Sequence, residues 1–236
     1  MLTLALDTSS PESSLAVFND TSIIASAKHH SHKLQTGFFK VMDDVFHEHN
    51  LSPREIKKVI MGIGPGSFTG VRVGVSLAKT LSQLTNAILI PIRSYYLAMG
   101  CLEHNAYYIP AIPSTRTECY AALFKIAIDG KIQTINEVDD GGPVRISYWL
   151  NHIDDKLPIH IYGEASWMFS DIDFPTDKKI ILHESSETMP DAIRAFNLLK
   201  LFPEIIVPID PLIARPLYVR PSPAELQRIE GQRGDK

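Results

Sequence analysis

Apolar and polar positions alternate at the start of the chain with the period of a β-strand. Leu2, Leu4 and Leu6 alternate with polar or small residues, and the small residues on the second face indicate that both faces are covered. Residues 7–11 are polar and end this strand, and two further apolar segments follow. The pattern predicts an opening meander of three strands at residues 2–7, 14–18 and 23–27.

The period changes to that of a helix after the meander. Residues 30–50 carry a broad apolar stripe, and Ser52 or Pro53 can start a short turn of helix through residue 57. The segments that follow are predicted as a buried strand at 59–63, a helix at 71–85, a strand at 87–92 and a helix at 94–103 capped by Ser94. Residues 1–104 therefore predict the order β-β-β-α-β-α-β-α.

The second half of the chain loosely echoes this order. Strands are predicted at 107–113, 118–128, 131–138, 158–162 and 179–183, and helices at 144–152 and 189–201. Residues 208–236 are proline-rich and then polar, with a short helix predicted at 224–229. Two similar α/β lobes with mixed central sheets, residues 1–104 and 105–236, describe the actin-like ATPase (ASKHA, ribonuclease H-like) fold, with a ligand cleft between the lobes.

A glycine-rich segment, Gly64-Pro65-Gly66-Ser67-Phe68-Thr69-Gly70, lies between a predicted strand and a predicted helix. Such a loop can present backbone N–H groups to a phosphate, and its glycines can equally let two backbones approach closely. A P-loop needs Lys directly after the last glycine, where this chain has Val, and the glycine spacing is one residue too wide for a dinucleotide fingerprint. The spacing therefore favours a packing hinge over a phosphate cradle.

Composition and charge exclude few classes of function. The chain has 236 residues with 44% hydrophobic and 21% charged residues, as in ordinary globular proteins, and its net charge of −4 offers no global attraction to nucleic acid. Cys101 and Cys119 do not form a C-x-x-C pair and are expected to be small buried hydrophobes. With no signal peptide pattern and no apolar stretch of membrane-spanning length, the protein is predicted to be cytoplasmic, without contact to a membrane.

Three motifs resemble the TsaB (YeaZ) family. They are Leu4-Ala5-Leu6-Asp7-Thr8-Ser9, the block G-P-G-S-F-T-G-V-R-V-G at residues 64–74, and Pro216-Leu217-Tyr218-Val219-Arg220. The resemblance is close over residues 1 to about 100 and loose over the rest. The family usually opens its second lobe with Asp-Ala-Arg and then Glu-x-Tyr. This chain keeps Glu118-Cys119-Tyr120 but has Pro113-Ser114-Thr115-Arg116 before it, so the Asp is absent.

The resemblance implies an actin-like fold and a role in tRNA modification. Family members are non-catalytic scaffold and activator subunits of the bacterial complex that transfers threonylcarbamoyl to N6 of adenosine 37 in tRNAs reading ANN codons. The resemblance implies a heterodimer with TsaD, which carries the chemistry, and a ternary complex with TsaE. It also implies a homodimer in isolation and only indirect contact with tRNA.

The residues themselves offer little catalytic equipment. His29, His30 and His32, and His47 with His49, lack the i, i+4 spacing that would bring two imidazoles onto one metal ion, so neither a catalytic nor a metal site is predicted. A carboxylate and two hydroxyls at the end of the first strand, together with the glycine loop, could make weak contact with ATP or ADP. The candidate phosphate-contacting residues are Asp7, Thr8, Ser9, Gly64, Gly66 and Ser67, and no cofactor is expected to be required. The alternatives are an ATP-binding actin-like enzyme, or a glycoprotease-like peptidase, for which no metal or nucleophile constellation is found.

The helices at 30–50 and 71–85 carry more apolar residues than one core-facing stripe needs. A second apolar stripe on a surface helix predicts a partner, whereas a helix buried on two sides within the fold would show the same pattern. The resemblance favours a partner, because family members pair through these helices. The predicted interface residues are Leu34, Phe38, Phe39, Met42, Val71, Val75, Leu77 and Ala78.

Overall fold

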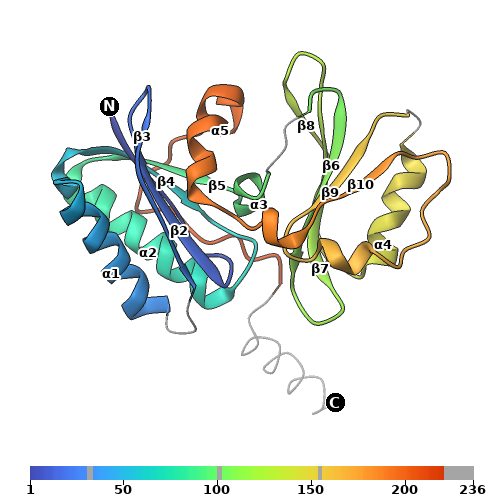
Figure 1. The fold of residues 1–236 in the computed structure, drawn as a ribbon, viewed down its shortest axis with the longest axis horizontal. Helices are drawn as coiled ribbons and strands as arrows, with labels where there is room; N and C mark the ends of the chain where they lie inside the picture. The colour runs from blue at the N-terminus through green and yellow to red at the C-terminus, as the bar shows by residue number, and fades with distance from the viewer. Residues whose placement is uncertain (31–33, 100–102, 154–155, 221–236) are drawn as a thin grey trace, which may run out of the picture.

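The computed structural model describes residues 1–30, 34–99, 103–153 and 156–220, and Figure 1 shows two sheets side by side. The first sheet has the strand order β3-β2-β1-β4-β5. Its strands are β1 (Leu2–Asp7), β2 (Glu12–Phe18), β3 (Ile23–His30), β4 (Ile56–Gly62) and β5 (Ile88–Ile92). The meander β1-β2-β3 is antiparallel, whereas β4 and β5 run parallel to β1.

The second sheet repeats this topology. Its order is β10-β9-β6-β7-β8, with β6, β7 and β8 antiparallel and β9 and β10 parallel to β6. The strands are β6 (Ala106–Pro113), β7 (Cys119–Ile126), β8 (Ile132–Gly141), β9 (Ile159–Tyr162) and β10 (Ile180–Leu182). Strand for strand, β6 to β10 therefore correspond to β1 to β5, and the predicted pair of similar lobes with mixed sheets is confirmed.

Helices cover both faces of the first sheet (Figure 1). α1 (Leu34–Glu48) and α2 (Phe68–Thr85) pack on one face in a core that includes Leu4, Val59 and Phe38. α3 (Ser94–Leu97) and α5 (Ala195–Leu201) pack on the other face, in a core shared with the inner face of the second sheet. α4 (Pro143–Ser147) covers the outer face of the second sheet. The short 3-10 turns are η1 (Pro53–Glu55), η2 (Tyr148–His152), η3 (Ser166–Phe169), η4 (Ser185–Glu187), η5 (Ala192–Arg194) and η6 (Pro203–Ile205).

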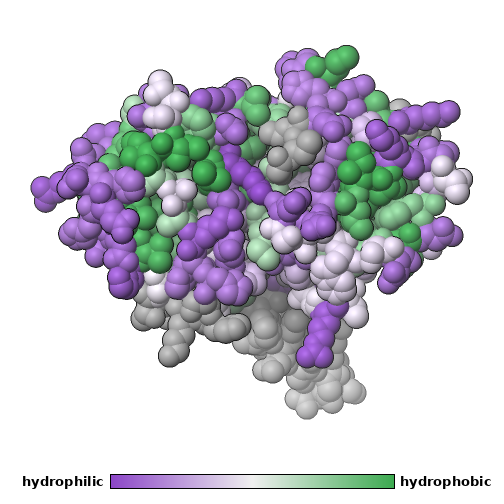
Figure 2. All heavy atoms as spheres, in the orientation of Figure 1, coloured by the Kyte–Doolittle hydropathy of each residue, from purple (hydrophilic) through white to green (hydrophobic). Residues whose placement is uncertain are grey.

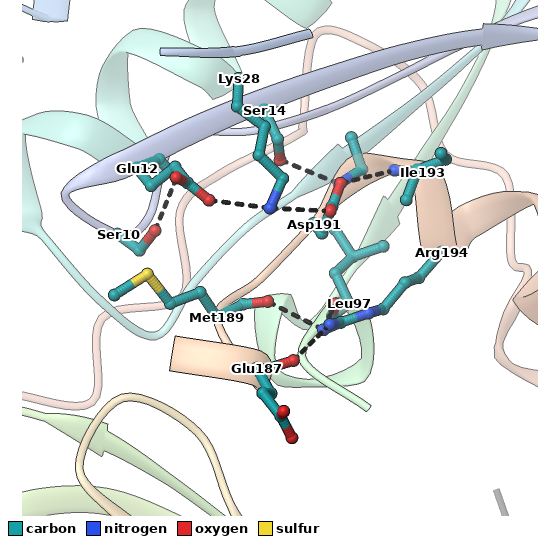
Figure 3. A network of polar contacts seen from close by, with 11 residues as sticks. Ser10, Glu12, Ser14, Lys28, Leu97, Glu187, Met189, Asp191, Ile193 and Arg194 are labelled. Carbon is teal, nitrogen blue, oxygen red and sulfur yellow. Dashed lines mark hydrogen bonds and ion pairs between the residues drawn. The ribbon is translucent and has the colours of Figure 1, made fainter. Parts of the chain in front are cut away.

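Residues 187–194 lead the chain back from the second sheet to the first. A network of polar contacts fixes this segment (Figure 3). The Lys28 ammonium lies 2.9 Å from a carboxylate oxygen of Glu12 and 3.1 Å from one of Asp191. Arg194 donates to the carbonyl oxygens of Leu97, Met189 and Glu187. These contacts hold α5 against the face of the first sheet. The division of the chain at residue 104 into two domains stays a prediction.

Three predicted helix boundaries were wrong. At each of them, strand pairing or a side-chain hydrogen bond decides where the element starts or ends, and the apolar pattern does not show it. β3 continues to His30, because its pairing with β2 runs to Glu12, so no helix starts at His30. α2 begins at Phe68 rather than Val71, because the Ser67 side chain accepts from the Gly70 N–H and caps the helix. α3 ends at Leu97, and its first residue is not a cap: the Ser94 hydroxyl accepts instead from the Gly64 N–H at 3.0 Å.

Two more predicted helices are shorter than expected. The segment 144–152 is split between α4 and η2, and the segment 189–201 begins as η5, since Pro190 and the Asp191 cap delay its start. The helix predicted at 224–229 lies outside the described residues.

The surface is mostly polar on the face shown in Figure 2, where apolar residues form separate patches. Among the residues that the structure describes, none of the helices combines the length and the apolar character that a membrane crossing needs.

Candidate functional site

Asp7 ends β1 and is fully buried. One of its carboxylate oxygens accepts hydrogen bonds from the Ser9 N–H at 2.8 Å and from the Ser9 hydroxyl at 2.6 Å. Its second oxygen, Oδ2, is also buried and lies where a Cβ on Gly62 would sit, at 1.7 Å from that position. Glycine at 62 therefore makes room for the Asp7 carboxylate. Burial raises the pKa of Asp7, and the Ser9 and Ser94 hydroxyls oppose this.

The glycine loop packs directly on the turn that follows β1. The Ser67 N–H donates to the Ser9 carbonyl at 2.7 Å, and the Thr8 hydroxyl donates to the Gly70 carbonyl at 2.7 Å. A Cβ at Gly66 would lie 2.3 Å from the Ser9 carbonyl oxygen, and one at Gly70 would lie 2.0 Å from that of Thr8. These positions need glycine because two backbones touch there.

This packing uses several of the N–H groups that a phosphate cradle would offer. The N–H groups of Gly64, Ser67 and Gly70 donate to Ser94, Ser9 and the Ser67 hydroxyl respectively. The structure thus brings together Asp7, Thr8, Ser9 and the loop, as the sequence predicted. Their contacts, however, are mainly with one another, which supports the packing hinge. Weak nucleotide contact at these residues stays a prediction.

A second buried carboxyl group approaches Asp7 from the other lobe. Glu164 follows β9, and its Oε1 is buried without a hydrogen-bond partner. Burial, with a smaller contribution from the negative charge of Asp7, raises the pKa of Glu164 to about 7, and the Ser10 hydroxyl opposes the shift. Sequence reasoning missed Glu164, since only folding brings the end of β9 to the end of β1. Glu164 therefore places a second carboxyl group near the end of β1.

The motif at 216–220 crosses between the lobes as a strap. The Leu217 N–H donates to the Ile63 carbonyl at 2.7 Å, and the Tyr218 ring stacks on Phe68 with centroids 5.0 Å apart. Arg220 reaches the second sheet, where its guanidinium lies 3.3 Å from Glu118 and 3.6 Å from Asp140. Strap, glycine loop and second lobe enclose a cavity of about 380 Å³ that is lined by Ser67, Ser114, Thr115, Tyr120 and Arg220 among others.

Known proteins resemble this chain in both sequence and fold. The family model for tRNA N6-adenosine threonylcarbamoyltransferase, TsaD, matches residues 24–140. The tRNA threonylcarbamoyladenosine biosynthesis protein TsaB of Bacillus subtilis is 26% identical over 162 residues, which cover 66% of this chain and 67% of that protein. TsaB of Escherichia coli is 32% identical over 128 residues, or 53% of this chain and 55% of that protein. The solved structure of YeaZ from Pseudomonas aeruginosa superposes with a TM-score of 0.69 at 17% identity, covering 92% of this chain and 99% of that one.

The chain is related in sequence to the TsaB (YeaZ) family. It is also related to TsaD, and it shares the actin-like fold of YeaZ. The aligned stretch spans little more than half of the E. coli TsaB protein.

The departure from the TsaB family motif at residues 113–116 has a structural counterpart on β8. The Ser114 hydroxyl donates to Asp140 at 2.5 Å, and Asp140 also faces Arg220. Thr115 accepts from the N–H groups of Thr117 and Glu118 and so shapes the turn before β7. A carboxylate therefore stands beside the start of the second lobe, but it comes from Asp140, which the pairing of β8 with β7 brings next to this turn.

A groove runs over α1 and α2, where TsaB proteins were expected to bind a partner. It has a volume of about 680 Å³ and is lined by Phe39, Phe68, Thr69, Arg72, Val73, Ser76, Leu77 and Thr80. Phe39 is 42% exposed. Arg72 lies over the Phe68 ring at 5.4 Å, so Phe68 is held between Arg72 in the groove and Tyr218 in the strap.

The predicted interface residues divide between this groove and the core. Phe39 lines the groove, and Met42 is half-buried against the core. Phe38, Val71, Val75 and Ala78 are at most 3% exposed, and Leu77, at 8%, shows only an edge in the groove. These five pack on the first sheet, which corrects their assignment to an open surface: in α2, Val71, Val75 and Ala78 share a core with β1 and β4. The Leu34 side chain lies outside the described residues.

The remaining candidate chemistry is sparse. Within the described ranges, no three or more His, Cys, Asp and Glu side chains come together in a way that could bind a metal ion. His32 lies outside those ranges. Cys119 is buried as expected, and burial raises the pKa of its thiol to about 12, which makes it a poor nucleophile. Cys101 is outside the described residues.

Proposed function

We propose that this chain is a non-catalytic scaffold and activator subunit in the cytoplasmic synthesis of N6-threonylcarbamoyladenosine in tRNA. Its partner is TsaD, which carries out the transfer, and TsaE joins the pair. The relationship to the TsaB family supports this role, because its relatives are named for this pathway. The chain contacts tRNA only through its partners in this proposal, in keeping with a net charge of −4.

The groove over α1 and α2 is the observation that carries the proposal. It combines apolar side chains, Phe39 and Val73, with a polar margin that includes Arg72 and Ser76. An apolar centre with a polar rim is the usual composition of a protein–protein interface, and arginine and phenylalanine are enriched in such places. A second copy of this chain can use the same groove when TsaD is absent, which gives the homodimer.

The cleft supports a role without turnover. The buried end of β1 faces a second carboxyl group, and N–H groups of the glycine loop are already bonded within their own lobe, so these N–H groups are not available to a nucleotide. No cofactor is required in this proposal, and ATP or ADP binds weakly at most. Calorimetry with ATP and Mg²⁺ that gives a dissociation constant in the micromolar range would instead support an actin-like enzyme.

We expect the double variant Phe39→Glu, Val73→Glu to weaken binding to TsaD of the same organism by about 100-fold or more, because two charges would replace apolar contacts near the centre of the interface. The measurement is surface plasmon resonance with purified partners. The matched control is Trp167→Glu, which introduces a charge at a 57% exposed aromatic residue of the second lobe and should leave affinity unchanged. Val75 and Leu77 are unsuitable positions, since a buried Glu there would unfold the chain.

Unchanged TsaD binding by a folded double variant would refute the interface. Reconstitution of the transfer reaction tests the role itself: TsaD and TsaE should modify tRNA efficiently only when this chain is added. Modification of tRNA by this chain alone would overturn the proposal.

A further inference from the structure

Three titratable side chains stand in a row at the β9–β10 edge of the second sheet. His160 lies on β9 and is 1% exposed. Its Nδ1 is 2.9 Å from Nε2 of His183, which directly follows β10. Its other nitrogen, Nε2, lies 3.4 Å from a carboxylate oxygen of Glu103, which is half-exposed. The row therefore leads from a surface carboxylate through a buried imidazole to a second imidazole.

The two imidazoles meet edge to edge. Their planes are inclined by only 20°, and the ring centroids are 5.2 Å apart although the nearest nitrogens are 2.9 Å apart. This is an in-plane N–H···N hydrogen bond, and it leaves no space for a metal ion between the nitrogens. Tyr108 stacks on His160 with centroids 4.9 Å apart and keeps its ring in this orientation.

The neighbouring charge selects the tautomers. A carboxylate beside Nε2 of His160 favours a proton on that nitrogen, which leaves Nδ1 as an acceptor. The hydrogen bond between the rings then uses the N–H of His183 Nε2. One shared hydrogen holds the pair together, and protonation of both rings would replace it with two donors facing each other.

We propose that Glu103, His160 and His183 form a proton-sensitive clasp that fastens β10 and the segment after it to the second sheet. β10 has three residues and lies at the sheet edge, so it has few contacts of its own. The clasp acts at its end, where the His183 N–H donates to the Ile161 carbonyl at 2.9 Å and the Ser166 hydroxyl donates to the His183 carbonyl at 2.8 Å.

The surroundings favour the neutral pair at physiological pH. Burial lowers the pKa of His160, with Glu103 opposing this and with His183 and Lys179 adding to it. Burial also lowers the pKa of His183, against Glu103 and Glu187. Because the folded protein holds fewer protons than the unfolded chain, stability decreases as the pH falls below about 6.5.

Opening of the clasp would change a pocket on the outside of the second lobe. This pocket, of about 390 Å³, is lined by Ser166, Trp167, Leu182, His183, Glu184 and Ser185 among others. His183 links its wall to the clasp, so protonation would loosen that wall while the core of the sheet remains in place.

Hydrogen exchange measured by NMR at pH 7.5 and pH 5.0 tests the clasp. In the wild-type protein we expect the protection factor of the His183 amide to fall by about tenfold or more at the lower pH, while amides of β6 keep theirs. Glu103→Gln should move this loss to lower pH, because the carboxylate that favours the imidazolium is gone. His47→Gln, an exposed histidine on α1, should change nothing.

The wild-type titration is decisive even if a variant fails to fold. Equal protection of the His183 amide at both pH values would overturn the proposal, as would a pH response of Glu103→Gln identical to that of the wild type. Side-chain ¹⁵N shifts provide a second check: both rings should carry their proton on Nε2 at pH 7.5.

Discussion

Gly70→Ala should lower the free energy of unfolding by about 3 kcal/mol. The added Cβ would lie 2.0 Å from the Thr8 carbonyl oxygen, and that atom belongs to backbone that cannot swing away. Relief would require α2 to move off β1, which breaks the hydrogen bond from the Thr8 hydroxyl to the Gly70 carbonyl. Urea denaturation followed by circular dichroism measures the change as a lower midpoint at constant slope.

Gly142→Ala is the matched control. A Cβ at position 142 meets nothing closer than the Thr117 carbonyl oxygen at 3.8 Å, and the backbone there is extended with φ of −71°. The same chemical change should therefore leave stability within about 0.5 kcal/mol of the wild type. Equal midpoints for the two variants would show that the glycine loop does not pack on the turn after β1, and the packing hinge would have to be abandoned.

Glu164→Gln is expected to stabilise the protein at pH 8 and to have almost no effect near pH 4. The pKa of Glu164 is raised from 4.5 to about 7, mainly by burial and also by Asp7. The folded state therefore holds the proton more tightly than the unfolded chain, so stability is greatest below about 4.5 and declines as the pH rises towards 7. Ionisation of Glu164 therefore costs about 3 kcal/mol of folding stability above pH 7. Glutamine does not ionise, so the variant does not lose this stability.

Thermal or urea unfolding at several pH values between 4 and 8 measures this difference. Glu48→Gln, which changes an exposed carboxyl group on α1, serves as the control and should follow the wild-type profile. A Glu164→Gln variant that runs parallel to the wild type over the whole range would mean that the Glu164 carboxyl group is not buried beside Asp7 in the folded protein.

Both predictions concern the interior of the cleft, where the glycine loop and Glu164 approach the end of β1. Backbone contacts hold the glycine loop against the turn after β1, and Glu164 brings a second carboxyl group near Asp7. The lobes are further joined by the strap and by the Arg194 network, so their relative orientation is set from both sides of the cleft. A partner bound at α1 and α2 would meet a surface supported by these contacts.

Much of this fold could be predicted from the sequence, for reasons local to each segment. Alternation in β1 and the apolar run of β4 identify strands, and the spacing of Phe38, Val45 and Phe46 identifies a helix with one buried face. Motifs that combine a polar strand end with a glycine loop identify the family. These patterns predict the structure correctly because the period of the side chains and the residue types of a turn depend only on residues close in sequence.

Boundaries and surfaces were less predictable. His30 reads as the start of a helix, yet pairing with Glu12 extends β3 through it. Val71, Val73 and Val75 read as a possible second stripe, yet the first sheet covers Val71 and Val75. Of these three only Val73 lines the groove over α1 and α2, beside Phe39 and Arg72. A helix pattern states how many apolar residues there are, but the neighbouring elements decide which of them remain exposed.

The sequence by itself determined the two-lobe fold and the family, because strand period, helix period and a long contiguous motif are written along the chain. Only the tertiary structure decided which polar side chains meet: Glu164 lies beside Asp7, Asp140 beside Ser114, and His160 between Glu103 and His183. Each of these joins residues from separate strands or loops, and their pKa values and hydrogen bonds depend on burial and distance, which exist only after the lobes have packed.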